Sequence, residues 1–192
     1  MILNNFLSPS RRLPILVSIV LVFLSGCTAK GLTPFDKRRT INKMHNEVLE
    51  ELYATVPNSR RQIKRAPGYA VFSNAQVSML FVSAAGGYGV ARSSGQVTYM
   101  KMGEAGVGLG LGIKDFRAVF IFHTRKAYQE FIRDGLVFGA DLDASLKSTD
   151  KGEQVSRSLR LGGITIYQMT DTGVSANANL KGAKFWRDDA LN

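Results

Sequence analysis

Cysteine, histidine and tryptophan are scarce in this chain. Its 192 residues include one cysteine, two histidines and one tryptophan. One cysteine cannot close a disulfide within the chain, and one cysteine with two histidines falls short of the four ligands of a structural zinc site. The sequence therefore excludes a disulfide framework and a cysteine- and histidine-based zinc fold, and we expect neither a metal nor another cofactor.

Acidic residues are also few, because 15 aspartates and glutamates stand against 25 lysines and arginines. The resulting formal charge of +10 indicates an anionic partner, either nucleic acid or a membrane surface. Hydrophobic residues make up 45% of the chain and charged residues 21%, which is a globular rather than a disordered composition. At this length the composition predicts one modest folded domain.

The N-terminal segment lacks an apolar run of the roughly 20 residues that a membrane-spanning helix needs. Arg11 and Arg12 precede an apolar run over residues 13–24, which is typical of an export signal. The triplet of residues 10–12 also resembles a twin-arginine signal, so both that route and the general secretory route stay open. The strongly apolar run favours the general secretory route.

Residues 24–27 read Leu-Ser-Gly-Cys and resemble the bacterial lipobox, in which the cysteine is acylated and the chain is cleaved before it. We therefore predict that Cys27 carries fatty acyl chains such as palmitate. Residues 1–26 would be a signal peptide, residues 27–33 a lipidated tether, and residues 34–192 a single domain. Thr28 rather than aspartate follows the cysteine, which favours an outer membrane lipoprotein facing the periplasm of the cell envelope.

A lipoprotein in this compartment does not meet nucleic acid. Anionic phospholipid, or another envelope polyanion such as lipopolysaccharide, is then the expected partner, and the membrane is the second partner through acylated Cys27.

An amphipathic helix is predicted over residues 34–55. Thr33 is a candidate N-cap and Pro34 fits the first helical position. Apolar residues repeat with a helical period up to Pro57, at Ile41, Met44, Val48, Leu49 and Leu52. We expect this face to pack on the core and Glu47, Glu50 and Glu51 to lie in solvent.

The densest charge cluster follows Pro57, as a short helix or turn over residues 58–65. Its cations repeat at helical spacing and are Arg60, Arg61, Lys64 and Arg65. They lie in a stretch between Glu51 and Glu104 that contains no acidic residue. Two interpretations compete, an anion-binding face and a solvated surface that keeps the protein soluble, and the predicted compartment favours the first.

From Gly68 onward the apolar period changes to two, which predicts strands separated by turns such as residues 92–95 and 170–173. The predicted strands cover residues 69–72, 77–82, 97–102, 116–122, 164–169 and 174–180. One helix is expected between an N-cap at Thr124 and Gly135. The polar residues 144–162 predict a long loop or a ragged hairpin. The fold class is therefore α+β, with a meandering, curled or barrel-like antiparallel sheet, an N-terminal amphipathic helix and one inserted helix.

Residues 106–112 alternate glycine with larger apolar residues, so a strand there would have one bare face. Close approach of another backbone layer is the preferred explanation, and a ligand groove is the alternative. The pattern is neither a dinucleotide fingerprint nor a phosphate-binding loop. The glycines at residues 86, 87 and 89 indicate the same need for small side chains.

The chain offers little catalytic machinery. Neither His45 nor His123 accompanies a nucleophile motif, and a structural role is expected for both. The carboxylate pairs at residues 141 and 143 and at residues 188 and 189 carry no sign of an acid and base division. We therefore expect that the protein is not an enzyme.

The order of several motifs resembles the SYLF lipid-binding domain family, in its exported bacterial branch. The resemblance covers residues 57–190 and rests on residues 66–72, 86–89, 106–112, 118–124, 138–141, 166–168 and 173–176. Eukaryotic relatives bind phosphoinositide membranes, and some act on actin assembly. The resemblance thus implies binding of phospholipid head groups. This chain lacks the SH3 and FYVE modules that accompany many of those relatives.

The function predicted from the sequence is therefore a membrane-anchored lipoprotein that binds anionic, phosphoinositide-like head groups through its basic face. The alternative is an envelope scaffold or protein-interaction module without a specific lipid ligand.

Overall fold

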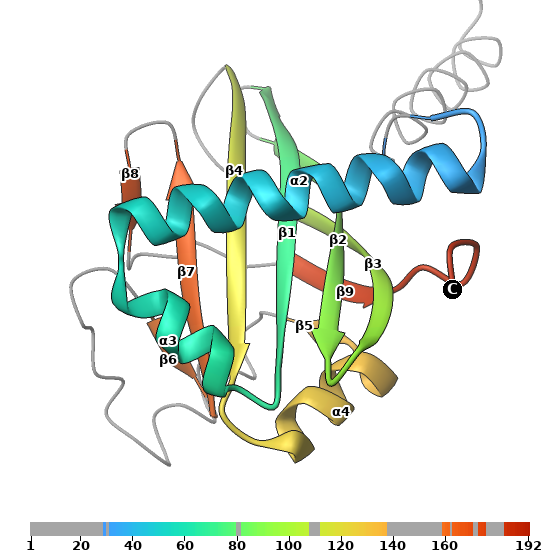
Figure 1. The fold of residues 1–192 in the computed structure, drawn as a ribbon. Helices are drawn as coiled ribbons and strands as arrows, with labels where there is room; N and C mark the ends of the chain where they lie inside the picture. Colours follow the sequence, from blue (N-terminus) through green and yellow to red (C-terminus); the bar gives the residue numbers. More distant parts are fainter. Residues whose placement is uncertain are drawn as a thin grey trace, which may run out of the picture.

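A computed structural model describes residue 29 and residues 31–79, 82–107, 112–137, 159–161, 163–170, 173–175 and 183–192. In the described part of the chain, three helices accompany one antiparallel sheet. The sheet is curled, with α2 and α3 across one face and α4 on the other (Figure 1). This arrangement confirms the predicted α+β class with an N-terminal helix and one inserted helix. Cys27 lies outside the described residues.

The helices begin where their capping residues predict. Helix α2 spans Pro34–Thr55, and the Thr33 hydroxyl oxygen accepts a hydrogen bond of 3.1 Å from the Asp36 amide. Helix α3 spans Asn58–Arg65 and follows α2 after a two-residue break that includes Pro57. Helix α4 spans Arg125–Asp134, with Thr124 as its N-cap. It ends at Gly135, whose φ of 74° lies in a region that favours glycine.

Nine strands in the described ranges form the sheet, in the order β5-β9-β3-β2-β1-β4-β7-β6 with β8 beside β7. Three 12-residue strands form its centre with β4, and the chain reverses between two of them at Ser94 and Gly95, which both have positive φ. The bounds are Gly68–Met79 for β1, Val82–Ser93 for β2, Gln96–Val107 for β3, Gly112–Phe122 for β4, Leu136–Val137 for β5, Leu159–Leu161 for β6, Ile164–Thr170 for β7, Gly173–Ser175 for β8 and Ala183–Arg187 for β9.

The sheet departs from the predicted meander at two places. Strand β4 pairs with β1 and not with β3, so the connection between β3 and β4 passes two neighbouring strands. The predicted strand over residues 77–82 is wrong, because Met79 of β1 faces Val82 of β2 and the chain reverses between them. The reversal falls within the apolar run of residues 79–82, which contains no glycine, proline or asparagine, so no local turn signal indicated it.

Other sequence predictions for strands hold in part. Of the polar residues 144–162, predicted to form a long loop or a ragged hairpin, the structure describes only 159–161, which form β6 and pair with β7, so that prediction stays untested. Strand β4 lies between β1 and β7, which confirms that residues 116–122 are central. Two predictions depend largely on residues outside the described ranges. The alternating glycine pattern of residues 106–112 includes residues 108–111, and the strand predicted over 174–180 falls mostly in residues 176–182.

Alternate residues of the strands point to opposite faces of the sheet and contribute side chains to two separate hydrophobic cores. Inside the curl, the Phe72 and Phe185 rings lie 4.8 Å apart and the Phe122 and Phe131 rings 5.0 Å apart. On the opposite face α2 buries its apolar stripe against the sheet. The predicted stripe, Ile41, Met44, Val48, Leu49 and Leu52, is buried as expected and packs with Val71, Val90, Val119 and Ile121.

The need for small residues on β2 is confirmed at two glycines. A methyl group at Gly87 would overlap the Ser73 carbonyl oxygen, and one at Gly89 would overlap the Phe72 ring. Gly89 faces Phe72 in the register of β1 and β2. The missing side chain therefore makes room for a buried aromatic ring of the inner core.

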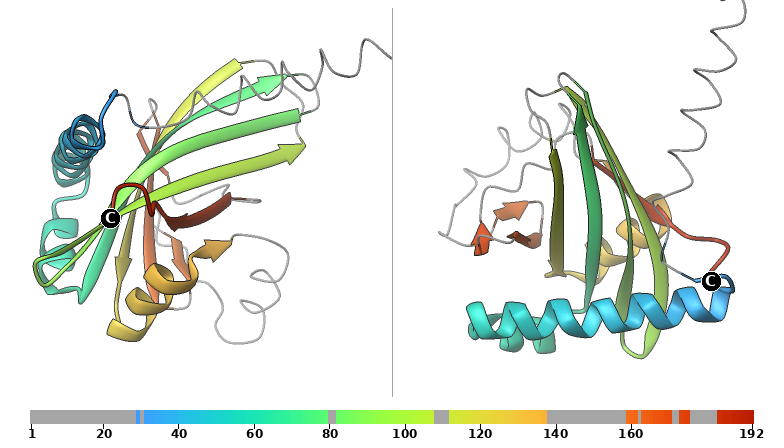
Figure 2. Two further views of the ribbon diagram at one scale, coloured as in Figure 1. Left: turned by 90° about the vertical axis from the view of Figure 1, so that its right-hand side faces the viewer. Right: turned by 90° about the horizontal axis from the view of Figure 1, so that it is seen from above.

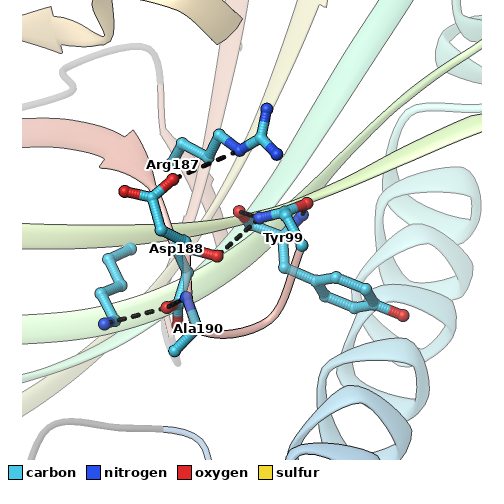
Figure 3. A network of polar contacts seen from close by, with 7 residues as sticks. Tyr99, Arg187, Asp188 and Ala190 are labelled. Carbon is cyan, nitrogen blue, oxygen red and sulfur yellow. Dashed lines mark hydrogen bonds and ion pairs between the residues drawn. The ribbon is translucent and has the colours of Figure 1, made fainter.

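The C-terminal tail, residues 188–192, forms polar contacts with β3 (Figure 3) and also with α2. The Asp188 amide donates to the Tyr99 carbonyl oxygen at 2.9 Å. The Asn192 side chain pairs with the Tyr99 backbone as a strand would, since its Oδ1 accepts at 3.0 Å and its Nδ2 donates at 2.8 Å. Arg38 of α2 donates from Nε to a carbonyl oxygen of this tail at 2.9 Å. Helix, tail and β3 are thus joined by polar contacts.

Candidate anion-binding face

Helix α3 is held against the sheet by one side of its surface. Ser59 and Ile63 are buried, and the Ser59 hydroxyl donates to the Val56 carbonyl oxygen at 2.6 Å. The Tyr167 hydroxyl of β7 donates to Gln62 Oε1 at 3.1 Å. These contacts fix which side of α3 points outward.

The outward side carries the predicted basic cluster, which we call the α3 basic face: Arg60, Arg61, Lys64 and Arg65. All four residues are exposed, as their spacing predicted. Within the described part of the chain, none of them forms an ion pair with an acidic side chain. Among the described residues, no acidic side chain therefore neutralises these four charges.

Two of these cations have neutral partners that orient them. The Arg60 guanidinium lies over the Tyr53 ring, with Cζ 4.2 Å from the ring centroid. Arg61 donates to Asn58 Oδ1 from Nε at 3.1 Å and from Nη2 at 2.6 Å. Neither contact removes a charge, so both guanidinium groups stay cationic while their positions are restricted.

The other two cations also serve the helix itself. Lys64 and Arg65 occupy the last turn of α3, where positive charge interacts favourably with the helix dipole. Each such contact is worth about 0.3–1 kcal/mol at an exposed site. Charge reversal there would therefore weaken α3 as well as any anion site, and neutral glutamine is the better substitution.

A shallow hollow adjoins the α3 basic face. It has a volume of about 500 Å³ and is lined by Pro57, Asn58, Arg60, Arg61 and Lys64. Three of its five lining residues are cations from the basic face, and Asn58 adds a polar amide. The hollow is open to solvent and lies directly beside these cations.

Glu51, the acidic residue nearest to α3 along the chain, forms an ion pair with an arginine of the sheet. Glu51 was expected in solvent, but its Oε2 lies 2.9 Å from Nη1 of Arg117 on β4, and both side chains are about two-thirds buried. That expectation is wrong because α2 turns Glu51 toward the strand that carries Arg117. Glu47 and Glu50 are exposed, as predicted. The pairing of Glu51 leaves its charge compensated rather than facing α3.

Helix α2 separates the basic face from the tether. Its 22 residues span about 33 Å, with residues 31–33 at one end and α3 beyond the other. Leu32 and Phe35 at the tether end are the most exposed large apolar residues of the described ranges, at 101% and 71%. The helix predicted over residues 34–55 therefore lies between the tether and the basic face.

The two histidines both have polar partners. His45 is a buried residue of α2, with Nε2 3.0 Å from the Tyr69 hydroxyl of β1 and Nδ1 2.9 Å from Asn46 Oδ1. Desolvation lowers the pKa of His45, and the positive charge of Arg92 also lowers it, whereas the hydrogen bond that His45 donates to Asn46 Oδ1 raises it. His123 Nε2 lies 2.7 Å from the Thr165 hydroxyl.

Other candidate chemistry is sparse in the described ranges. They contain no cluster of three or more histidine, cysteine or acidic residues that could hold a metal ion. Of the carboxylate pairs, Asp188 contacts Lys101 at 3.0 Å within the structure, and residues 141 and 143 lie outside the described residues. A search of the same ranges finds no helix both long and apolar enough to cross a membrane.

Sequence reasoning found the four cations but not their surroundings. Tyr53 and Asn58 are ordinary members of α2 and α3 by sequence, and their contacts follow from the angle between the two helices. A tyrosine seven residues before an arginine, across a proline, is a weak local signal of such stacking. The hollow has no sequence signal, since it is formed by the break at Pro57.

Comparison with known proteins identifies a relative of this chain. No known family model matches this chain. Over 160 residues, or 83% of its length, the chain is 31% identical to the protein named Beta cell expansion factor A from Aeromonas veronii. The matched region covers 60% of that protein. The chain is therefore a homologue of this factor and spans about three-fifths of its length.

Proposed function

We propose that this chain is a lipid-anchored protein of the bacterial envelope that binds anionic phospholipid head groups through the α3 basic face. The observation that carries the proposal is four exposed cations, without acidic partners in the described part of the chain, around an open hollow. Membership of the SYLF family belongs to the same proposal. It is supported by the motif order of the sequence and is compatible with the fold.

The size of the expected effect follows from the number of charges. Each lysine or arginine near an anionic membrane contributes about 1 kcal/mol, so four contribute about 4 kcal/mol. This corresponds to about a thousandfold in partitioning. The contribution weakens with salt, because the Debye length shortens from about 10 Å at 0.1 M to about 3 Å at 1 M.

Sedimentation with vesicles tests the proposal. The mature chain from residue 27 would carry Cys27→Ser, so that no acyl chain contributes to binding. The test variant is Arg61→Gln with Lys64→Gln, which removes two charges from the hollow. The matched control is Arg125→Gln with Lys126→Gln, which removes two exposed charges from α4 on the other face of the sheet (Figure 1).

With vesicles containing acidic lipid at low salt, the test variant should partition about thirtyfold less than the parent, since two contacts of about 1 kcal/mol are lost. The control should lose much less. Equal losses in both variants would show that net charge rather than the α3 basic face governs binding. Unchanged binding of the test variant would refute the lipid site.

A protein-interaction module remains the alternative function. The uncovered outer face of α2 favours it, because 22 residues of helix lie across the sheet with no described element over them. A module of this kind would show no dependence on lipid charge in the same sedimentation experiment.

A further inference from the structure

The outer side of α2 is a long polar surface that nothing in the described ranges covers. Seen along its axis and from above, the helix lies on the outside of the sheet with one side free (Figure 2). The exposed residues repeat at spacings of four and three, which places them in one line along the helix. This line, which we call the α2 stripe, consists of Arg39, Lys43, Asn46, Glu50 and Ala54.

The α2 stripe changes sign along its length. Its first half carries Arg39 and Lys43, with side chains 75% and 77% exposed, and its second half carries Glu50, with exposed Glu47 beside it. Within the helix these charges are weakly engaged, since Lys43 Nζ lies 3.7 Å from Glu47 Oε1 and both are exposed. Such a surface is complementary to itself when it is turned by 180°.

We propose that two copies of this chain pair through antiparallel α2 stripes about a twofold axis. The midpoint between Lys43 and Glu50 falls between Asn46 and Glu47. With the axis there, Lys43 lies opposite Glu50 of the partner subunit, and the reverse contact is made by symmetry. Arg39 then faces Ala54 of the partner subunit, and the two Asn46 side chains meet near the axis.

The contacts of this pair are charged rather than apolar, so the association is weak in dilute solution and sensitive to salt. Confinement of both copies to one membrane surface would raise their effective concentration. At the ends of the pair, the basic start of one α2 approaches the basic face of the partner, and these like charges oppose pairing. An anionic head group between them would relieve that repulsion.

Pairing would also bring the basic face back to the membrane. In one copy, about 33 Å of helix separates the tether from α3. In the antiparallel pair, the tether end of each α2 lies beside the α3 of the other copy. The attraction between the copies comes from the charges of α2, and this return to the membrane is the consequence that rests on the proposed lipid function.

Cysteine cross-linking of the full-length chain in intact cells tests the geometry. Asn46→Cys lies near the axis, whereas copies of Ala54→Cys would be about 22 Å apart along the helices and beyond disulfide reach. Mild oxidation should therefore link Asn46→Cys into dimers and leave Ala54→Cys monomeric. The parent chain, with Cys27 alone, is the background. Dimers in both variants to the same extent, or in neither, would overturn the proposal.

A charge exchange tests the pairing by a second route, in the Asn46→Cys background. Lys43→Glu and Glu50→Lys should each lower the cross-linking yield at least about fivefold, because each places like charges opposite one another. The two together should restore it. Residues 43 and 50 are two turns apart and cannot form an ion pair within one helix. Absence of restoration would refute the antiparallel register, whatever the outcome of the vesicle experiment.

Discussion

Replacement of Gly89 by alanine tests whether the inner core depends on a missing side chain. The new methyl group would overlap the Phe72 ring and the Val71 carbonyl oxygen. Phe72 is fully buried, and its ring centroid lies 4.8 Å from that of Phe185 and 5.5 Å from that of Phe120. Neither the ring nor the neighbouring strand has space to retreat, so the substitution must displace packed groups.

Overpacking of this kind costs about 1–3 kcal/mol. For a domain of this size, each kcal/mol lowers Tm by about 2–4 °C, so Gly89→Ala should lower Tm by about 2–12 °C. Thermal unfolding followed by circular dichroism measures the loss. The reduction should be smaller in a Phe72→Leu background, because the smaller side chain frees the space.

The matched control is Gly95→Ala in the β2–β3 turn. A methyl group there meets nothing within 4 Å, and its cost comes from a φ of 84° instead. Its effect should therefore be the same with Phe72 or leucine on β1. The overpacking argument would be refuted if Gly89→Ala left Tm unchanged, or if Phe72→Leu coupled equally to both glycine substitutions.

Three further predictions concern pH, the tail and the anchor. The folded-state pKa of His45 lies below its usual value, so the free energy of unfolding should fall as the pH drops through about 6.5, where the unfolded chain binds a proton that the folded chain does not; His45→Gln should flatten this slope and His123→Gln should not. Asp188→Ala should lower the free energy of unfolding, measured by chemical denaturation, by about 1–3 kcal/mol, because Lys101 and the Ala190 amide lose their carboxylate partner. The control Asp189→Ala removes a side chain that is 92% exposed and should change the free energy of unfolding by less than about 0.5 kcal/mol. Cys27→Ser should release the full-length protein from the salt-washed membrane fraction, and a protein that stays processed and membrane-bound would contradict the lipobox interpretation.

Local signals in the sequence predicted the helices closely. Thr33 and Thr124 cap α2 and α4 as expected, and Gly135 ends α4. These signals work because a capping side chain bonds to a backbone amide only two or three residues away. The basic face was found for the same reason, since helical spacing alone places its four cations together.

Features that depend on distant segments were not predicted. Strand β9 is short and pairs with β3, about 80 residues earlier, so its own sequence carries little signal. The reversal between β1 and β2 has no turn residue, and the placement of β4 beside β1 depends on pairing across the whole sheet.

The tail contact between Arg38 and the last residues joins positions 153 apart in the chain. A contact of this range cannot form until residues 188–192 have left the ribosome, long after α2 itself has been made. Strand β9 is made shortly before, so β3 keeps an open edge until then. Because long-range pairing is slow to form, the pairing of β9 with β3 and the contact of the tail with α2 are expected among the last steps of folding.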